Sequence, residues 1–362
     1  MSSRSLQSVL IMAGGTGGHV FPALAAADCL REEGINVQWL GTKKGIESKL
    51  VPAADIPIHY INVSGLRGKG LLSLLKAPVN IISAVFQALQ VIRQLKPDCV
   101  LGMGGFVSGP GGVAAWLTRR PLVIHEQNAV AGTTNRLLAN LATRVLKGYP
   151  ITLGGKKGLF IGNPVREQIA NIVKPEQRWV DDSKELKLLV LGGSLGSKPI
   201  NDVLLQTLTQ LSESDRPNIW HQAGAAHVDQ VSQAYCNAHI DAKVEAFIGD
   251  MASAYSWADL VLCRAGALTV AELTAAGVAS ILVPLPHAID DHQTQNARWL
   301  SEKQAAILLK QASMSAQGLA KLLLELTRDR SRLLAMAKSA RQLAKVDAAQ
   351  QVAAHCLEVA RV

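Results

Sequence analysis

The sequence predicts two doubly wound α/β domains, and three observations carry this prediction. The chain has 362 residues, which exceeds the usual size of one domain. Short apolar runs alternate with helical stretches in both halves, as is typical of parallel sheets covered by helices on both faces. A glycine-rich turn follows the first apolar run of each half, at residues 14–18 and 192–196. Hydrophobic residues make up 48% of the chain and charged residues 18%, a composition that excludes a disordered protein.

The first half contains predicted strands that are short apolar runs, and predicted helices fill the gaps between them. The strands are Val9–Met12, Val37–Leu40, Ile58–Ile61, Val100–Gly102, Leu122–Ile124 and Arg144–Leu146, and the helices are Pro22–Glu33, Leu71–Leu95, Pro110–Leu117 and Thr133–Leu141.

The second half repeats this alternation. Its predicted strands are Leu186–Leu191, Ile219–Gln222, Val244–Phe247, Leu260–Cys263, Ser280–Val283 and Ala305–Leu309, with a helix at Lys198–Leu211. A polar stretch at 166–186 is interpreted as a linker. Two final helices, Arg330–Ala344 and Ala348–Val359, are expected to pack on either half. We expect ligands at the carboxyl ends of the strands, in a cleft where the two domains face each other.

Charge divides unevenly between the halves. Residues 1–165 carry 17 Lys and Arg against 7 Asp and Glu, a net charge of +10, whereas the rest carries 20 against 21, a net charge of −1. This asymmetry indicates an anionic partner for the first half or simply a soluble basic surface. Aromatic residues are only 4%, which argues against a base-stacking nucleic-acid binder.

Localisation and cysteine chemistry follow from the same composition. No apolar run reaches the ~20 residues that span a bilayer, and the apolar run at Val9 is too short for a signal peptide, so we expect a cytosolic protein. The five cysteines are far apart and without a CxxC pair, which favours buried free thiols.

Three glycine loops follow predicted strands, at 14–18, 102–112 and 192–196. Glycines allow backbone N–H groups to approach an anion, so three such loops favour phosphate contacts over simple tight turns. The first loop does not fit the dinucleotide pattern GxGxxG, and no acidic residue follows the second strand, which disfavours a nicotinamide oxidoreductase. The phosphate-loop pattern GxxxxGK[ST] is also absent.

Polar residues at strand ends are the candidate functional groups. His19 is a candidate base or a helix cap, and Arg166 is a candidate diphosphate ligand or a surface residue. Glu126 and Asn128 are candidates for binding substrate hydroxyls or for capping a loop. Glu272 is a candidate ribose ligand or a helix-dipole carboxylate.

A metal site is not indicated, because the sequence has no DxD triplet, no HExxH and no Cys/His cluster, and we expect no cofactor. Residues 64–76 combine apolar side chains with Arg67, Lys69 and Lys76. This segment is predicted either to rest on an anionic bilayer or to form a core helix with a basic end.

Taken together, the motifs resemble the MurG family of peptidoglycan glycosyltransferases over nearly the whole chain. The matching segments are GGTGGHVFP (14–22), SGLRGKG (64–70), LGMGGFVSGPGG (101–112), HEQN (125–128), GNPVR (162–166), GGSLG (192–196) and RAGALTVAE (264–272). The resemblance implies a GT-B architecture: an acceptor- and membrane-facing domain at 1–164, a UDP-GlcNAc-binding domain at 165–345, and a helix at 346–362 that packs back on the first domain.

The resemblance also implies site residues. His19 matches the position that we assign to the catalytic base. Glu272 matches the ribose-binding carboxylate, and Gln293, with its neighbour His292 as the rival, matches the glutamine that binds sugar hydroxyls. Leu195 stands where relatives often have glutamine, so only backbone contacts are expected there. The implied UDP-GlcNAc contacts are Thr16, Gly17, Gly18, Asn128, Arg166, Ser194, Ile248, Ala267, Leu268, Thr269, Val270, Ala271, Glu272 and Gln293.

The implied reaction is inverting transfer of N-acetylglucosamine from UDP-GlcNAc to the C4 hydroxyl of the N-acetylmuramic acid of lipid I, giving lipid II. The implied place is the cytoplasmic face of the inner membrane, with peripheral attachment and with cell-wall synthesis and division proteins as candidate partners. The alternatives are another GT-B enzyme, such as a lipid glycosyltransferase or a UDP-GlcNAc epimerase, and a non-catalytic membrane scaffold that does not bind UDP.

Overall fold

The computed structural model describes residues 8–63, 77–179, 185–193, 195–286 and 291–360. Its contacts divide the chain into two compact units. Unit 1 takes in residues 1–166 and 345–362, and unit 2 takes in residues 167–344. Each unit contains its own parallel sheet, so the predicted α/β class with two Rossmann-like sheets is confirmed. None of the helices in the described ranges is both long and apolar enough to cross a membrane.

Unit 1 is built on a sheet of seven parallel strands within the described ranges, in the order β3-β2-β1-β4-β5-β6-β7. The order reverses between β1 and β4, which is the point where ligands bind in sheets of this kind. The strands are β1 (Ser8–Met12), β2 (Asn36–Gly41), β3 (Ile58–Tyr60), β4 (Cys99–Gly102), β5 (Leu122–Glu126), β6 (Arg144–Lys147) and β7 (Gly158–Phe160).

Side chains alternate between the two faces of this sheet, because successive strand residues point to opposite sides. Val9 and Ile11 of β1 enter the core on one face, whereas Leu10 and Met12 enter the core on the other. The first face is covered by α1 and α16, and the second by α4, α5 and α6. The helices of unit 1 are α1 (Gly17–Glu32), α2 (Glu47–Ala53), α4 (Ala77–Leu95), α5 (Ser108–Leu117), α6 (Thr133–Leu138) and α16 (Ala348–Ala360), with a short 3-10 turn at Gly155–Lys157.

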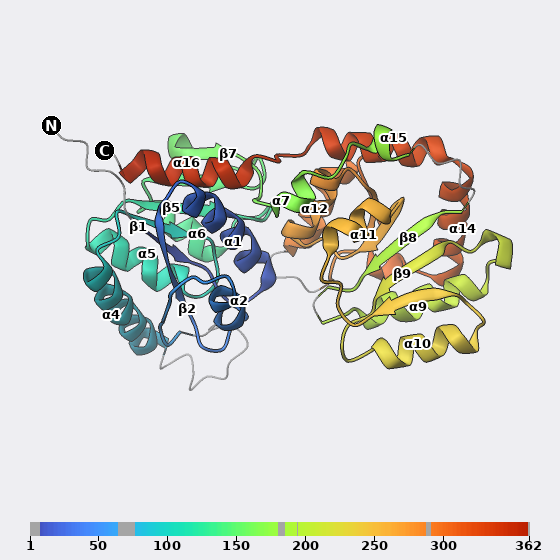
Figure 1. Cartoon of the computed structure of the whole chain (residues 1–362), viewed down its shortest axis with the longest axis horizontal. Coiled ribbons are helices and arrows are strands. Elements are labelled where there is room, and N and C mark those ends of the chain that lie inside the picture. Colours follow the sequence, from blue (N-terminus) through green and yellow to red (C-terminus); the bar gives the residue numbers. More distant parts are fainter. Residues whose placement is uncertain (1–7, 64–76, 180–184, 194, 287–290, 361–362) are drawn as a thin grey trace. The chain divides into compact units, whose positions relative to one another are not determined.

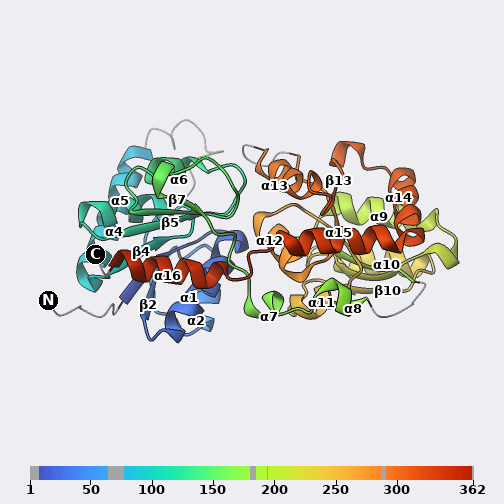
Figure 2. The same cartoon turned by 90° about the horizontal axis from the view of Figure 1, so that it is seen from above.

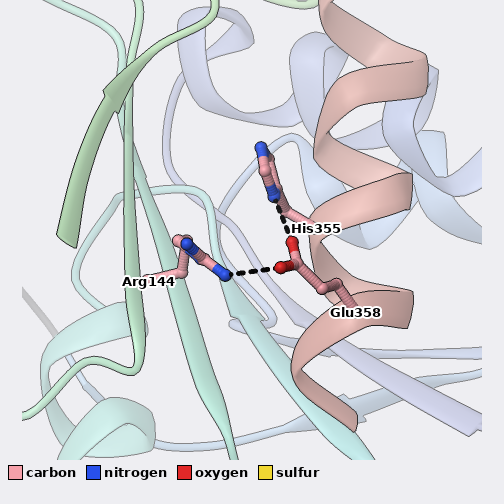
Figure 3. Close-up of polar contacts among 3 residues, drawn as sticks. All are labelled: Arg144, His355 and Glu358. Atoms are coloured by element: carbon pink, nitrogen blue, oxygen red, sulfur yellow. Dashed lines mark hydrogen bonds and ion pairs between the residues drawn. The ribbon is translucent and has the colours of Figure 1, made fainter. Parts of the chain in front are cut away.

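Helix α16 comes from the far end of the chain and lies beside α1 (Figures 1 and 2). Its buried Val352, Cys356 and Val359 complete the core on that face of the sheet. At its edge, Glu358 accepts a hydrogen bond from Arg144 of β6 (2.9 Å) and contacts Nδ1 of His355 (3.0 Å), as Figure 3 shows. The contact with His355, followed by the charge of Arg144, lowers the pKa of Glu358.

Unit 2 contains a sheet of six parallel strands within the described ranges, in the order β10-β9-β8-β11-β12-β13. The order reverses between β8 and β11, so unit 2 has a switch point of the same kind as unit 1. The strands are β8 (Lys187–Leu191), β9 (Asn218–Gln222), β10 (Ala242–Glu245), β11 (Leu260–Cys263), β12 (Ala279–Leu282) and β13 (Ile307–Leu308). The helices are α7 (Glu167–Ala170), α8 (Pro175–Arg178), α9 (Lys198–Thr209), α10 (Val228–Asn237), α11 (Met251–Trp257), α12 (Ala267–Ala276), α13 (His292–Ser301), α14 (Ala316–Arg328) and α15 (Arg330–Gln342), with 3-10 turns at Glu213–Asp215 and Gln311–Ser313.

The structure corrects several predicted boundaries. Helix α1 begins at Gly17, five residues before the predicted start at Pro22, which lies inside the helix. Strand β5 continues to Glu126, and the short strand β7 was not predicted. The stretch 166–186 is not a plain linker, because it contains α7 and α8 and buries Ile169 and Ile172 in unit 2. Residues 64–76, the predicted membrane segment, lie outside the described residues.

Candidate active site

The first glycine loop connects β1 to α1 at the switch point of unit 1. Thr16 is the N-cap of α1 and His19 is the third residue of the helix. Oγ1 of Thr16 lies 3.4 Å from Nδ1 of His19, and the His19 side chain is half-buried. Gly17 and Gly18 form the first turn of the helix, so the predicted placement of His19 at a helix start is confirmed.

The loop after β4 lies directly against this first loop. Gly104 has a φ of +99°, and a methyl group added to it would come 2.8 Å from Nε2 of His19. Gly105 (φ +83°) faces the backbone carbonyl of Gly14 so closely that no side chain fits between them. Ser108 of α5 holds the loop through bonds to the N–H of Gly104 (3.0 Å) and its carbonyl (2.8 Å). Glycine at these positions is therefore required by close packing around His19.

The segment HEQN continues from β5. Of the two interpretations of Glu126, the structure supports loop capping, because this residue is buried and its carboxylate accepts four bonds. The donors are the N–H groups of Asn128 (3.0 Å) and Gly132 (3.0 Å) and the side-chain amides of Asn128 (3.4 Å) and Asn135 (2.9 Å). Glu126 thus shapes the loop that carries Asn128, whose own side chain is half-buried.

A chain of contacts joins these segments to Arg166. Gln127, which is buried, donates to the carbonyl of Met103 (2.7 Å), and Asn163 donates to the carbonyl of Gln127 (2.9 Å). The guanidinium of Arg166 lies 5.5 Å from the ring centroid of Phe21 on α1. The predicted residues of unit 1 therefore lie together at the carboxyl ends of its strands. They are Thr16, Gly17, Gly18, His19, Asn128 and Arg166.

In unit 2, the loop after β8 holds the motif GGSLG. Ser194 lies outside the described residues, and the side chain of Leu195 is 83% exposed. Gly196 (φ +77°) packs against the carbonyl of Ala223, again with no room for a side chain. Arg264, directly after β11, donates to Oγ of Ser197 (2.8 Å) and to Oε1 of Gln311 (2.7 Å). Arg264 also donates to the carbonyls of Val283 (3.1 Å) and Pro284 (3.3 Å), so its guanidinium places a positive charge beside the second glycine loop while it ties that loop to the segment after β12.

Helix α12 begins at Ala267 with Gly266 as its N-cap, as the sequence predicts. Its residues do not all face outward, because Ala267, Val270 and Glu272 are buried whereas Leu268, Thr269 and Ala271 are half-buried. Tyr255 of α11 donates to Oε2 of Glu272 (3.1 Å), which fixes this carboxylate.

The remaining predicted residues of unit 2 lie in different surroundings. Ile248 is buried, with 2% of its surface exposed. Oε1 of Gln293 accepts the N–H of Leu285 (2.9 Å), so the side chain of Gln293 supports the loop after β12. Its neighbour His292 is the first residue of α13 and is half-buried.

Two supporting residues were missed by sequence reasoning. Glu47 is fully buried beneath the first glycine loop, and Gln127 links two of the loops in unit 1. Gln127 lies within the HEQN motif, but no role was predicted for it, and Glu47 belongs to none of the motifs, because the partners of both residues come from other strands. The only local signal for Glu47 is an acidic residue at the start of a short helix.

Comparisons with known proteins assign the family. Residues 9–147 match the glycosyltransferase family 28 N-terminal domain, and residues 187–352 match the glycosyltransferase family 28 C-terminal domain. The crystal structure of Acinetobacter baumannii MurG is 42% identical, covers 97% of this chain and 99% of its own, and superposes with a TM-score of 0.83. This chain belongs to the MurG family of glycosyltransferases.

Curated relatives of this MurG-family chain are similar over almost the full length. A protein of Cellvibrio japonicus is 56% identical over 98% of both chains, and one of Marinobacter nauticus is 51% identical over 99% of both. Each is named UDP-N-acetylglucosamine--N-acetylmuramyl-(pentapeptide) pyrophosphoryl-undecaprenol N-acetylglucosamine transferase. A UDP-bound structure of Anabaena HepE, at 15% identity and a TM-score of 0.61, shares the fold alone.

Proposed function

We propose that this chain transfers N-acetylglucosamine from UDP-GlcNAc to the C4 hydroxyl of the N-acetylmuramic acid of lipid I, and so makes lipid II. The observation that carries the proposal is 51–56% identity, over 98–99% of the chain, to relatives named for this transfer. The residues that we propose for this transfer lie in both units, from the His19 loop to Glu272.

The reaction is a single displacement at the anomeric carbon. The acceptor hydroxyl attacks from one face and UDP leaves from the other, so the configuration inverts. A base must accept the hydroxyl proton, and donors must stabilise the charge that grows on the leaving diphosphate. His19 is the proposed base, because its half-buried ring lies at the switch point of unit 1 with Nδ1 near Thr16.

Unit 2 is the proposed donor domain, and its charge distribution supports this assignment. The guanidinium of Arg264 lies beside the second glycine loop, and the backbone N–H groups at the start of α12 follow β11, the strand that pairs with β8. These groups favour the diphosphate of UDP. Glu272, held by Tyr255, is the proposed ribose ligand. The further proposed UDP-GlcNAc ligands of unit 2 are Ser194, Ile248, residues 267–271, and Gln293 or His292. The proposed ligands in unit 1 are Asn128, Arg166 and the Thr16–Gly18 turn.

Unit 1, including α16, is the proposed acceptor- and membrane-facing domain. Helix α4 exposes Val79 (69%), Ile82 (69%) and Phe86 (57%), which recur at the spacing of one helical face. Trp116 of α5, the helix that packs beside α4, is 53% exposed. An apolar surface on a unit of strong positive charge fits an anionic bilayer, and we assign peripheral attachment at the cytoplasmic face of the inner membrane to this surface.

The test measures UDP release from UDP-GlcNAc with and without a short-chain lipid I analogue. Acceptor-dependent release with a β-linked disaccharide product supports both substrates and the inverting outcome. Folded protein that binds UDP but shows no acceptor-dependent release contradicts the proposed acceptor and favours another GT-B nucleotide-sugar enzyme.

A further inference from the structure

Glu47 is a fully buried acidic residue that the proposed mechanism does not use. It is the first residue of α2, and none of its surface is exposed. A buried carboxylate is costly unless hydrogen bonds compensate for its lost hydration. Its position in unit 1 therefore calls for a reason beyond packing.

The Glu47 carboxylate joins the ends of two neighbouring strands. Oε2 accepts the N–H of Gly15, in the loop after β1 (2.9 Å). Oε1 accepts both the N–H (2.9 Å) and the Oγ1–H (2.7 Å) of Thr42, directly after β2. A methyl group at Gly14 would come 2.5 Å from Oε1, and one at Gly41 would come 2.9 Å from Cγ. The glycines thus leave just enough space for this side chain.

We infer that Glu47 is a positioning residue for the proposed base His19, an inference that rests on the proposed function. Gly15 precedes Thr16, the N-cap of α1, whose carbonyl accepts the N–H of His19 (3.1 Å) and whose Oγ1 lies 3.4 Å from its Nδ1. By holding Gly15, Glu47 fixes the path of the loop and with it the orientation of the imidazole. It acts through the backbone and not by contact with substrate.

The same bond changes what the first glycine loop can bind. The N–H of Gly15 is already used by a negatively charged group, so this amide is not available to a phosphate. In unit 2 the charge beside the loop is positive, since Arg264 bonds Ser197. The two similar loops are therefore held differently: a carboxylate holds the first through the N–H of Gly15, and a guanidinium holds the second through Ser197.

The test is Glu47→Gln, which keeps the shape of the side chain but replaces one acceptor oxygen by a donor. One carboxylate oxygen becomes an NH₂ group that faces either the N–H of Gly15 or the two donors of Thr42, so a donor meets a donor in both orientations. Asp98→Asn is the matched control, because Oδ2 of Asp98 accepts the N–H of Ser8 (3.1 Å) at the opposite end of β1.

We expect Glu47→Gln to lower kcat by about 10- to 100-fold, since small displacements of a catalytic group cost this much. The stoichiometry of UDP binding should stay within about twofold of the wild type, because most of the proposed donor ligands lie in unit 2. The KM for UDP-GlcNAc should change less than kcat, because only the Thr16–Gly18 turn is displaced. Asp98→Asn should retain full kcat. A merely structural role would instead lower the UDP-binding stoichiometry and the rate in equal proportion.

An unchanged kcat in folded Glu47→Gln, or a loss explained by fewer UDP sites, overturns the inference. If this variant does not fold, Thr42→Val decides, because it removes one donor and leaves the carboxylate intact. Its kcat should fall about three- to tenfold, and a wild-type value also overturns the inference. A wild-type protein without acceptor-dependent UDP release would contradict the proposed function itself, a result that is separate from any of these variants.

Discussion

His19 and Gly104 are in direct contact, although they follow different strands of unit 1. A methyl group on Gly104 would come 2.8 Å from Nε2 of His19, and the φ of Gly104 is +99°. The imidazole therefore packs against the backbone of Gly104, and the loop after β4 limits where the ring can lie. This contact ties the orientation of the proposed base to a residue 85 positions away in the chain.

Gly104→Ala is expected to reduce kcat by about tenfold or more, because the added methyl group displaces the imidazole. Steady-state UDP release with the lipid I analogue measures this. Gly34→Ala is the control: Gly34 also has a positive φ (+76°), but nothing lies within 4 Å of the added carbon. An equal loss in both variants would attribute the effect to backbone strain and not to His19.

His19→Ala is expected to lower turnover by about 10²–10⁴-fold, the usual contribution of a general base. Binding of UDP should be unchanged, because His19 is not among the proposed UDP-GlcNAc ligands. Single-turnover rates and UDP titration on the same preparation separate the two effects. A near-normal rate would remove His19 from the role of base.

Substitution of Ile82 and Phe86 by Glu is expected to weaken binding of the protein to vesicles that contain anionic lipid, because both side chains are exposed on α4. Sedimentation with vesicles measures the bound fraction. Val173→Glu, at a residue 56% exposed in unit 2, is the control.

The basic residues Arg67, Lys69 and Lys76 are expected to contribute to membrane binding, so reversal of their charges should weaken binding further. Unchanged binding to vesicles in both sets of variants would contradict membrane attachment through α4 and these basic residues.

Acid is expected to destabilise both units through buried histidines. Burial lowers the pKa of His125 in unit 1 and of His221 in unit 2 to about 4, whereas an unfolded histidine titrates near 6.5. Between these values only the unfolded chain binds the proton, so stability is complete above pH ~6.5 and is lost as the pH falls towards ~4. The total loss is about 3 kcal/mol for each histidine.

Urea unfolding at several pH values between 7.5 and 5 checks this expectation. His221→Gln removes one titrating group and should flatten the pH dependence for unit 2, whatever its effect at neutral pH. His227→Gln, at a residue that is not fully buried, is the control. An unaltered slope in the His221 variant would show that another group dominates the acid response.

The attachment of α16 is expected to depend on its apolar face more than on its ion pair. Val352→Ala should lower the free energy of unfolding by about 2 kcal/mol, because the side chain is fully buried. Glu358→Gln should change it little, since that side chain is 56% exposed. Thermal unfolding of the two variants compares them. A larger loss for Glu358→Gln would make the contact with Arg144 and His355 the main attachment.

Strands were predicted well because their signal is local. The run Val9–Met12 is apolar on both faces, and β1 lies there with one additional residue. The start of α1 was wrong because Pro22 is typical of a first helical turn, whereas here the preceding glycines already form that turn. The end of β5 was missed because His125 and Glu126 are polar, and their burial depends on bonds to Gly162, Asn128, Gly132 and Asn135.

The sequence indicates the motifs of the proposed site but not the residues that support them. His19 and Glu272 are proposed from glycine loops and strand ends, which are visible in a single stretch of sequence. Glu47 could not be identified, because its role requires β2 to pair beside β1 so that Gly15 and Thr42 meet at one carboxylate. Such a contact depends on the order of the strands in the sheet, and the local pattern of apolar residues does not predict that order.

The late position of α16 has a consequence for how the protein is made. The strands of unit 1 leave the ribosome first, but the part of one sheet face that α16 covers stays open until Val352, Cys356 and Val359 have been synthesised. All of unit 2 is produced in between and can fold as an uninterrupted segment. During translation the nascent chain is therefore expected to expose an apolar surface that is prone to aggregation, and a ribosome that stalls within unit 2 leaves unit 1 unfinished.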